Sequence, residues 1–338
     1  MSNGVARKYD VYAVGTALID YQYALSETQS RQFSLEHGGT IINAEQEQAL
    51  LQQLSKIDPV RVCGGSGANT LAVISQLGGK TFYSCKVAAD EVGQLYQNNL
   101  HDAKIETDLQ FDYKQATGKC FIIVLSDGER ILHSFLGANC NLSPQDLRND
   151  IIKNANYIFI EAFSSAVSAS SKLTAETAIK IAKQCDTKVA LTLSTCRPSF
   201  ISRHDFVKTA GTGVDLLFCN EFEANFFCGT EQLNIAKEKL KAIAKQFVIT
   251  LGKEGALLFD GNHFIEVPAY PSDAIDTTGA GDIFAGAFLF AITHGASFLQ
   301  AGNLASFAAA KSVTRVGARL STSIINEIKK EHMRAYSA

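Results

Sequence analysis

The sequence of 338 residues contains no tryptophan, only two methionines, and eight cysteines that form no CxxC pair. None of its seven histidines lies near another histidine or a cysteine at the spacing of a metal site. The missing pairs argue against a disulfide-rich secreted scaffold and give no support for a transition-metal centre. We therefore expect a cytoplasmic protein with reduced thiols.

An excess of charge of one sign is also missing, because 31 lysines and arginines stand against 34 aspartates and glutamates. No block of basic residues stands out, so we expect neither nucleic acid nor an anionic membrane as a partner. Residues 1–10 lack the apolar segment of a signal peptide, and the apolar run 283–292 is too short to span a bilayer. The expected partner is a small molecule.

The chain has 46% hydrophobic residues, enough to bury the core of one large domain or two smaller ones. From about residue 143 onward, short apolar runs alternate with segments of helical character, which predicts a mostly parallel sheet with helices on both faces. Ligands bind to such sheets at the carboxyl ends of the strands. Four runs end there in a polar residue or a glycine: residues 157–160 before Glu161, 189–193 before Ser194, 216–219 before Asn220, and 247–251 before Gly252.

The residues before about 140 lack this rhythm, and they include a polar stretch at 21–58. The apolar run 119–125 turns at Asp127-Gly128 and returns through 131–135, which indicates a β-hairpin. These pieces predict a small, β-rich accessory domain.

Residues 276–282, Asp-Thr-Thr-Gly-Ala-Gly-Asp, lead directly into the apolar run 283–292, where we expect a helix to begin. Glycines let backbone amides approach a ligand closely, and the free N–H groups of a first helical turn attract anions such as phosphate. Asp282 would then lie beside that anion. It suits a helix cap, and it equally suits a base that removes a proton from a hydroxyl attacking phosphorus, so the spacing alone leaves both readings open.

Neither this segment nor the earlier glycine-rich loop at 64–70 matches the GxxxxGK[ST] motif of P-loop nucleotide hydrolases. The dinucleotide motif GxGxxG fits Gly279 and Gly281, but Phe284 occupies its third glycine position. What remains is one glycine-rich turn for a substrate and another for phosphate beside a carboxylate. Those are the parts that a small-molecule kinase needs.

With both turns in view, the chain resembles the PfkB/ribokinase family of carbohydrate and nucleoside kinases. The resemblance rests on four segments in order: Gly-Gly-Ser-Gly-Ala-Asn-Thr at 64–70, Asn-Glu-Phe-Glu at 220–223, Thr-Leu-Gly-Lys-Glu-Gly at 250–255, and residues 276–282. It implies an α/β fold, a ribokinase-like αβα sandwich with a mostly parallel central sheet and a small β-sheet lid. In this chain the core is expected at 1–15, 59–107 and 139–338, and the lid at 16–58 and 108–138.

Carried over residue by residue, the resemblance makes Asp282 the catalytic base. It makes Gly279, Ala280 and Gly281 the backbone donors of an anion hole. On the acceptor side it implies that Asp20 accepts hydrogen bonds from sugar hydroxyls. The remaining acceptor contacts that it implies are Gly64, Gly65, Asn69 and Glu161.

For the nucleotide, the resemblance implies ATP with Mg²⁺, organised by Asn220 and Glu223. Glu223 would act on the metal through water, because Mg²⁺ keeps much of its hydration, although a first-turn helix charge is the alternative role for this residue. Thr250 and Gly252 are expected beside the phosphates or the ribose, and Ser306 near the adenine.

Asp276 and Thr278, with backbone groups around Ser312, Arg315 and Gly317, resemble the loop of those family members that K⁺ activates. The sequence leaves a response to K⁺ open, and it does not choose between a monomer and a homodimer.

The acceptor is expected from finer details. Residues 15–20, the form of the motif at 64–70 and the segment 161–163 are most similar to the bacterial adenosine-kinase-like branch. We therefore expect transfer of the γ-phosphoryl group of ATP to a primary hydroxyl of a nucleoside, with adenosine as the first candidate. A sugar kinase acting on ribose, fructose or a keto-deoxy sugar acid is the alternative. A catalytically idle nucleotide or sugar sensor is the alternative of another class.

Overall fold

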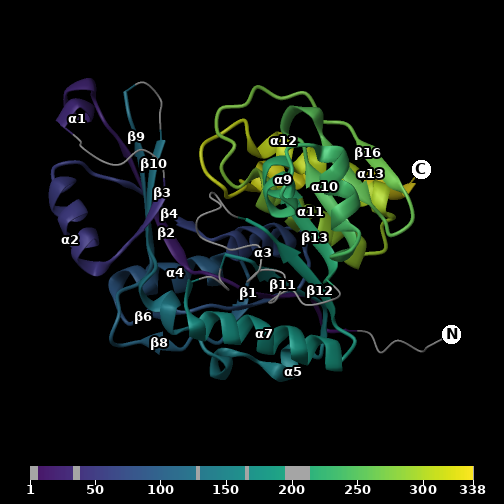
Figure 1. Ribbon diagram of the computed structural model, residues 1–338, viewed down its shortest axis with the longest axis horizontal. Coiled ribbons are helices and arrows are strands. Elements are labelled where there is room, and N and C mark those ends of the chain that lie inside the picture. The colour runs from purple at the N-terminus through teal and green to yellow at the C-terminus, as the bar shows by residue number, and fades with distance from the viewer. Residues whose placement is uncertain (1–6, 33–38, 127–129, 164–166, 195–213, 338) are drawn as a thin grey trace.

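The computed structural model describes residues 7–32, 39–126, 130–163, 167–194 and 214–337 (Figure 1). It contains a large sheet flanked by helices and a smaller sheet that projects from it. The expected turn at Asp127-Gly128 lies outside the described residues. Within them, no helix is both long and apolar enough to cross a membrane.

Among the residues that the structure describes, the larger sheet has nine strands in the order β16-β15-β14-β13-β12-β11-β1-β5-β7. The strands from β14 to β7 run parallel, and β15 and β16 join antiparallel at one edge. Strands β11 to β14 coincide with the four apolar runs, so the predicted mostly parallel sheet is confirmed. The bounds are β1 (Tyr9–Val14), β5 (Thr81–Ser84), β7 (Glu106–Thr107), β11 (Ala155–Glu161), β12 (Lys188–Thr192), β13 (Val214–Asn220), β14 (Ala244–Thr250), β15 (Ala256–Phe259) and β16 (Phe264–Val267).

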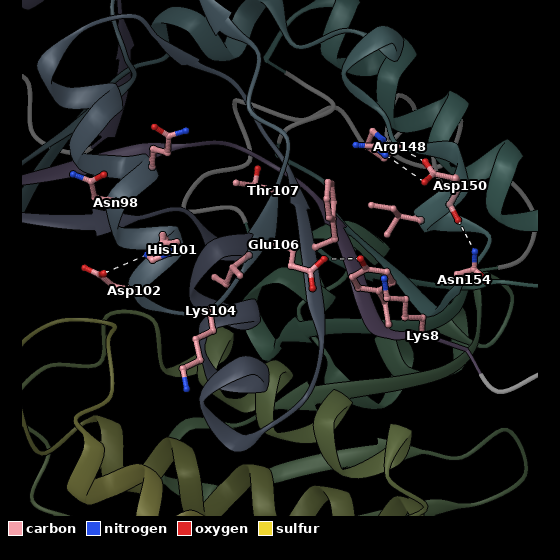
Figure 2. A pocket seen from close by; sticks show the side chains of 15 residues that line it. Lys8, Asn98, His101, Asp102, Lys104, Glu106, Thr107, Arg148, Asp150 and Asn154 are labelled. Carbon is pink, nitrogen blue, oxygen red and sulfur yellow. Dashed lines mark hydrogen bonds and ion pairs between the residues drawn. The ribbon is translucent and has the colours of Figure 1, made fainter.

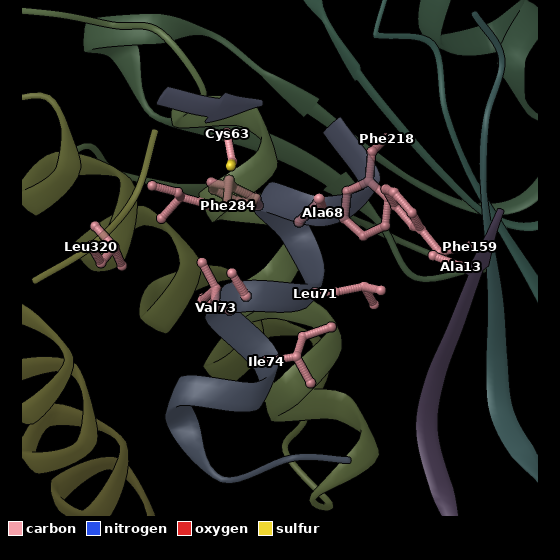
Figure 3. Packing of buried hydrophobic residues seen from close by; sticks show 14 of the residues in the cluster. Ala13, Cys63, Ala68, Leu71, Val73, Ile74, Phe159, Phe218, Phe284 and Leu320 are labelled. Carbon is pink, nitrogen blue, oxygen red and sulfur yellow. The ribbon is translucent and has the colours of Figure 1, made fainter. Parts of the chain in front are cut away.

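Helices cover both faces of this sheet, because successive strand side chains point to opposite sides. Phe159 and Phe218 pack on one face with residues of helix α3, as Figure 3 shows, and Ile158 and Leu217 pack on the other. The first face is covered by α3 (Ser66–Leu77), α11 (Ala280–Thr293), α12 (Phe298–Ser312) and α13 (Thr322–Ser337), and the second by α5 (Asn149–Ile152), α7 (Ala169–Gln184), α9 (Glu221–Cys228) and α10 (Leu233–Leu240), while α4 (Glu91–Asp102) packs against β7.

Helix α11 lies in the middle of the first face, and its residues 283–291 are all buried. A Cβ atom at Gly286 would lie 2.6 Å from the backbone oxygen of Thr70 and 2.8 Å from Cβ of Val73. Only a glycine therefore lets α11 approach α3 this closely. Asp282 lies one turn before Gly286 on the same side of the helix, so this contact brings Asp282 to the first turn of α3.

In the described part of the chain, the smaller sheet has five strands in the order β3-β10-β9-β2-β4. Strands β9 and β10 pair antiparallel, which confirms the predicted hairpin. One face is covered by α2, whose Glu47 forms a buried ion pair with Lys119 of β9 at 2.6 Å. The bounds are β2 (Leu18–Ala24), α1 (Glu27–Gln32), β3 (Gly39–Ile42), α2 (Ala44–Gln53), β4 (Val60–Gly64), β9 (Lys119–Val124) and β10 (Arg130–Phe135), and a separate short pair joins β6 (Val87–Ala88) to β8 (Phe111–Asp112).

Helices α1 and α2 lie on the side of the smaller sheet that faces away from the larger one (Figure 1). Strand β4, which leads into α3, comes from a range that was expected in the core. The division of the chain into core and lid at the stated boundaries stays a prediction.

Candidate active site

Asp282 lies in the first turn of α11 but does not cap this helix. The N-cap is Gly279, at φ +75°, and no side chain caps the helix. The Asp282 carboxylate instead accepts hydrogen bonds from α3: Ser66 Oγ donates to Oδ1 at 2.5 Å, and Asn69 Nδ2 donates to Oδ2 at 2.9 Å. The side chain is thus held in one orientation between two helix starts.

Burial raises the pKa of Asp282 above its ordinary value, and the hydrogen bonds from Ser66 and Asn69 and the charge of Arg319 oppose that rise. Burial also raises the pKa of Asp20 to about 7, with Arg319 opposing and Asp282 adding to the rise. The two carboxyl groups therefore lie close enough to influence each other. A carboxylate with a raised pKa is a stronger base, which suits proton removal near neutral pH.

The glycine loop before α3 fits closely around Asp20 and the end of β1. A Cβ atom at Gly64 would lie 2.8 Å from both carboxylate oxygens of Asp20. Gly65 adopts φ +91°, and a Cβ there would lie 2.2 Å from the backbone oxygen of Thr16. Larger residues at these two positions would push Asp20 and the β1–β2 connection away from the loop.

Glu161, the last residue of β11, lies beneath this loop and is 1% exposed. Its Oε2 accepts from Thr16 Oγ1 at 2.8 Å, and its Oε1 accepts from the amide of Gly67 at 2.5 Å and from Tyr83 Oη at 3.4 Å. Burial raises its pKa to about 7, against the hydrogen bonds from Gly67 and Thr16. In the structure Glu161 ties the loop to the end of β1, and its contact with an acceptor stays a prediction.

A cavity of about 550 Å³ lies beside the start of α11. Five of the residues expected around the nucleotide and the anion hole line it: Thr250, Gly252, Ala280, Gly281 and Ser306. Ser306 donates a hydrogen bond to the backbone oxygen of Pro268 at 2.8 Å, which fixes its side chain at the cavity wall. Segments far apart in the sequence thus form one concave site next to Asp282.

Asn220 and Glu223 form a capping box at the start of α9. The Glu223 amide donates to Asn220 Oδ1 at 2.7 Å, and the Asn220 amide donates to Glu223 Oε2 at 2.9 Å. Asn220 pairs with Thr250 across the parallel strands β13 and β14, so the box lies next to the cavity wall. Glu223 therefore has the structural role in the first turn of a helix that was the alternative to a role at the metal. Its effect on Mg²⁺ stays a prediction.

Asp276 organises the turn that precedes α11. Its Oδ1 accepts from the amide and hydroxyl of Thr278 at 3.0 and 2.7 Å, and its Oδ2 accepts from the amide of Gly317 at 2.9 Å. The amide of Asp276 donates to the backbone oxygen of Val313. The structure thus brings together both segments that were expected to form the cation loop.

Three further residues of the site were not predicted from the sequence. Ser66 binds Asp282 through its hydroxyl, and its place in the motif at 64–70 was a signal that could have suggested this. Thr16 and Arg319 lie in segments without a motif, and only the tertiary packing brings them to Glu161 and Asp282.

A separate hollow of about 1280 Å³ lies beside β7, at the edge of the larger sheet (Figure 2). Its lining residues Tyr9 and Glu106 begin β1 and β7, so the hollow opens at the amino ends of strands, whereas the predicted site lies at their carboxyl ends. Its Arg148 is already paired with Asp108 and Asp150. No residue predicted for the active site lines it.

Comparison with known proteins agrees with the fold. The profile of pfkB family carbohydrate kinases matches residues 44–325. A ribokinase from Staphylococcus aureus (strain COL) is 28% identical over 280 residues, which cover 79% of this chain and 87% of the relative. An adenosine kinase from Saccharomyces cerevisiae is 24% identical over 328 residues, which cover 90% of this chain and 94% of the relative.

Two solved structures share the whole architecture. A probable sugar kinase protein from Rhizobium etli CFN 42 superposes with a TM-score of 0.86 at 27% identity, covering 96% of this chain and 98% of that one. The adenosine kinase from Sinorhizobium meliloti superposes with a TM-score of 0.85 at 28% identity, covering 96% and 99%.

Proposed function

This chain belongs to the pfkB family of carbohydrate kinases, and we propose that it transfers the γ-phosphoryl group of ATP to a primary hydroxyl of a nucleoside, with adenosine as the first candidate. It has the ribokinase-like α/β fold and, as a member of this family, is a phosphotransferase with an alcohol group as acceptor. The observation that carries the proposal is the Asp282 carboxylate, held by α3 at the start of α11 and beside the cavity.

Asp282 is the proposed base that takes the proton from the acceptor hydroxyl as it attacks the γ-phosphorus. Gly279 is the N-cap of α11, and Ala280 and Gly281 begin its first turn, where the N–H groups of a helix point toward an anion. In the structure the Ala280 amide donates to the backbone oxygen of Thr277 at 3.2 Å, so its proposed donation to a phosphoryl oxygen would replace or share that bond. The base and the anion hole thus come from one helix start, which keeps their spacing fixed during the reaction.

Asp20, with Gly64, Gly65 and Asn69, forms the proposed acceptor side. Asp20 pairs with Val62 of β4 and with Cys120 of β9. Ile122, two residues beyond Cys120, lies on the same face of the smaller sheet. A sugar bound by its hydroxyls to Asp20 would carry any attached group toward these apolar side chains. This favours an acceptor with a flat, largely apolar base, and an adenosine kinase is among the structures that match the whole chain.

ATP is the proposed occupant of the cavity, with its phosphates toward Gly281 and its adenine toward Ser306, and with Thr250 and Gly252 between them. Bound Mg²⁺ would neutralise phosphate charge. The described residues contain no cluster of three or more carboxylate, histidine or cysteine side chains for a metal, which fits an ion held by phosphates and water with Asn220 and Glu223 behind them. The turn around Asp276 and Thr278 is the proposed site of K⁺ in an activated enzyme.

The test is ADP release from Mg-ATP in the presence of a panel of nucleosides, ribose, fructose and a keto-deoxy sugar acid. We expect nucleosides, and adenosine above the others, to stimulate turnover, and the Asp282→Asn variant to lack this stimulation. A free sugar with the highest kcat/KM would overturn the nucleoside assignment. If no acceptor raises ADP release above the background, the chain is an idle sensor and the proposal fails.

A further inference from the structure

The segment 317–320, between α12 and α13, is wedged between the starts of α11 and α3. The Gly317 amide donates to Asp276 Oδ2 at 2.9 Å. Ala318 packs so closely on Gly279 that a Cβ at the glycine would lie 2.3 Å from Ala318 Cβ. Arg319 follows, and its Nη1 donates to the backbone oxygen of Ala68 in α3 at 2.9 Å.

The Arg319 guanidinium is buried in an unusual way. Its Nε and Nη2 atoms are buried and have no hydrogen-bond partner among the residues that the structure describes. Burying a charged group without partners is expensive, so its location calls for a compensating interaction. Electrostatic attraction to nearby carboxylates provides such an interaction, without the direct contact of a salt bridge.

The opposite charge comes from the active site. Arg319 acts electrostatically on Asp20 of β2 and on Asp282 of α11, and in both cases it lowers the carboxyl pKa against the effect of burial. The other titratable groups nearby are Cys63 of β4, which faces Asp20, Glu161 of β11, which faces Asp282, and Tyr96 of α4, which faces Arg319 and Glu161. The polar groups that bind Asp282 are Ser66 and Asn69 of α3. Arg319 is the one positively charged group in this set.

We propose that Arg319 is a positioning residue for the reaction: it anchors the first turn of α3 through Ala68, and its buried guanidinium supplies the positive charge that faces Asp282 and Asp20. Ala68 directly precedes Asn69, which binds Asp282, so the anchor and the base share one turn of helix. The inference rests on the proposed kinase function, because it assigns a role to Arg319 within that reaction.

The charge and the hydrogen bond can be separated by substitution. Arg319→Gln can still donate to the Ala68 oxygen but carries no charge, and Arg319→Lys keeps the charge. Arg334 on α13 provides the matched control, because its side chain is 79% exposed and pairs only weakly with Glu331 at 3.7 Å.

The experiment measures kcat/KM for the best acceptor between about pH 5 and 9 at saturating Mg-ATP. Loss of the positive charge raises the carboxyl pKa, so Arg319→Gln should move the acidic limb upward by about one pH unit. Its activity should then fall roughly tenfold near the bottom of that limb and approach the wild-type value at high pH. In Arg319→Lys the acidic limb should lie close to its wild-type position, and Arg334→Gln should match the wild type.

An acidic limb that stays in place in Arg319→Gln, or a loss of activity that is equal at every pH, overturns the proposal. Carboxyl-¹³C NMR titration measures the same effect without turnover, with the Asp282 and Asp20 signals assigned by their loss in Asp→Asn variants. Unchanged pKa values in Arg319→Gln would refute the electrostatic role. If the wild type shows no acceptor-stimulated turnover, the proposed function fails while this titration still decides on Arg319.

Discussion

The sharpest test of the active site is Asp282→Asn, because the structure allows this change without disturbing the fold. Ser66 Oγ can donate to the asparagine oxygen as it does to the carboxylate. The new amide nitrogen would meet Asn69 Nδ2, also a donor, at the present 2.9 Å. That conflict is relieved if the Asn69 amide turns over, since its Oδ1 atom has no partner among the described residues and can accept the bond.

The magnitude follows from the role of the side chain. A positioned general base contributes a rate factor of about 10² to 10⁴, so kcat should fall by at least roughly 100-fold, or about 2.7 kcal/mol of transition-state free energy. Burial raises the pKa of Asp282, which means that the ionised carboxylate weakens the folded state above that pKa. The asparagine variant should therefore be as stable as the wild type or more stable at pH 8, because no buried charge remains.

The assay combines three measurements on the same sample: acceptor-stimulated ADP release, ATP binding by calorimetry and urea unfolding. Asp102→Asn is the matched control, since its side chain is 82% exposed at the far end of α4. A large loss of kcat with intact ATP binding and an undiminished free energy of unfolding supports the base. Near-normal turnover in Asp282→Asn would refute the reasoning, and so would a loss that is explained by unfolding.

Three further outcomes follow from the structure. Gly286→Ala should lower the free energy of unfolding by about 1–3 kcal/mol in urea titration, because its Cβ would press on the backbone of Thr70, and an unchanged midpoint would contradict the close approach of α3 and α11. Glu223→Gln keeps an oxygen for the Asn220 amide, so it should raise the Mg²⁺ concentration for half-maximal activity with little loss of stability, and an identical Mg²⁺ titration would count against that role. The pKa of Asp20 is raised from 3.8 to about 7, so the folded state binds the Asp20 proton more tightly than the unfolded chain does, and ionisation of Asp20 lowers stability as pH rises from about 4 to 7. Asp20→Asn should therefore be more stable than the wild type at pH 7.5 by about 1–3 kcal/mol, with a smaller difference at pH 5. Equal differences at the two pH values would reject the shift.

Much of the architecture could be predicted because it depends on local patterns. The apolar runs of β11 to β14 each end at a polar residue or at a glycine soon after, and this alone located the carboxyl edge of the sheet. The hairpin of β9 and β10 was visible for the same reason. The glycines at 64–65 and 279–281 predicted a close approach of backbone to a ligand. The structure places a protein atom within 2.8 Å of the Cβ position at Gly64, Gly65 and Gly279, while none lies within 4 Å at Gly281 among the described residues, and the approach to a ligand stays a prediction.

What the sequence could not predict depends on contacts between distant segments. Glu161 was expected to face an acceptor, and the structure surrounds it with Thr16, Gly67 and Tyr83, which no spacing rule connects to it. Arg319 lies in a segment with no motif, and only the packing of Ala318 on the start of α11 brings it to the site. The roles assigned to these residues therefore stay proposals that variants must test.

The charges gathered at this site bear on the choice of acceptor. The charge of Asp282 acts on the carboxyl groups of both Asp20 and Glu161, and Arg319 is the one cation among the groups named beside them. An acceptor that brought its own carboxylate would add to this repulsion in a buried setting, where interactions between charges are strong. A neutral nucleoside or sugar adds none. The electrostatics therefore oppose a keto-deoxy sugar acid, while the apolar face around Val62 and Ile122 favours a nucleoside over a bare sugar, so the two arguments converge from independent features of the site.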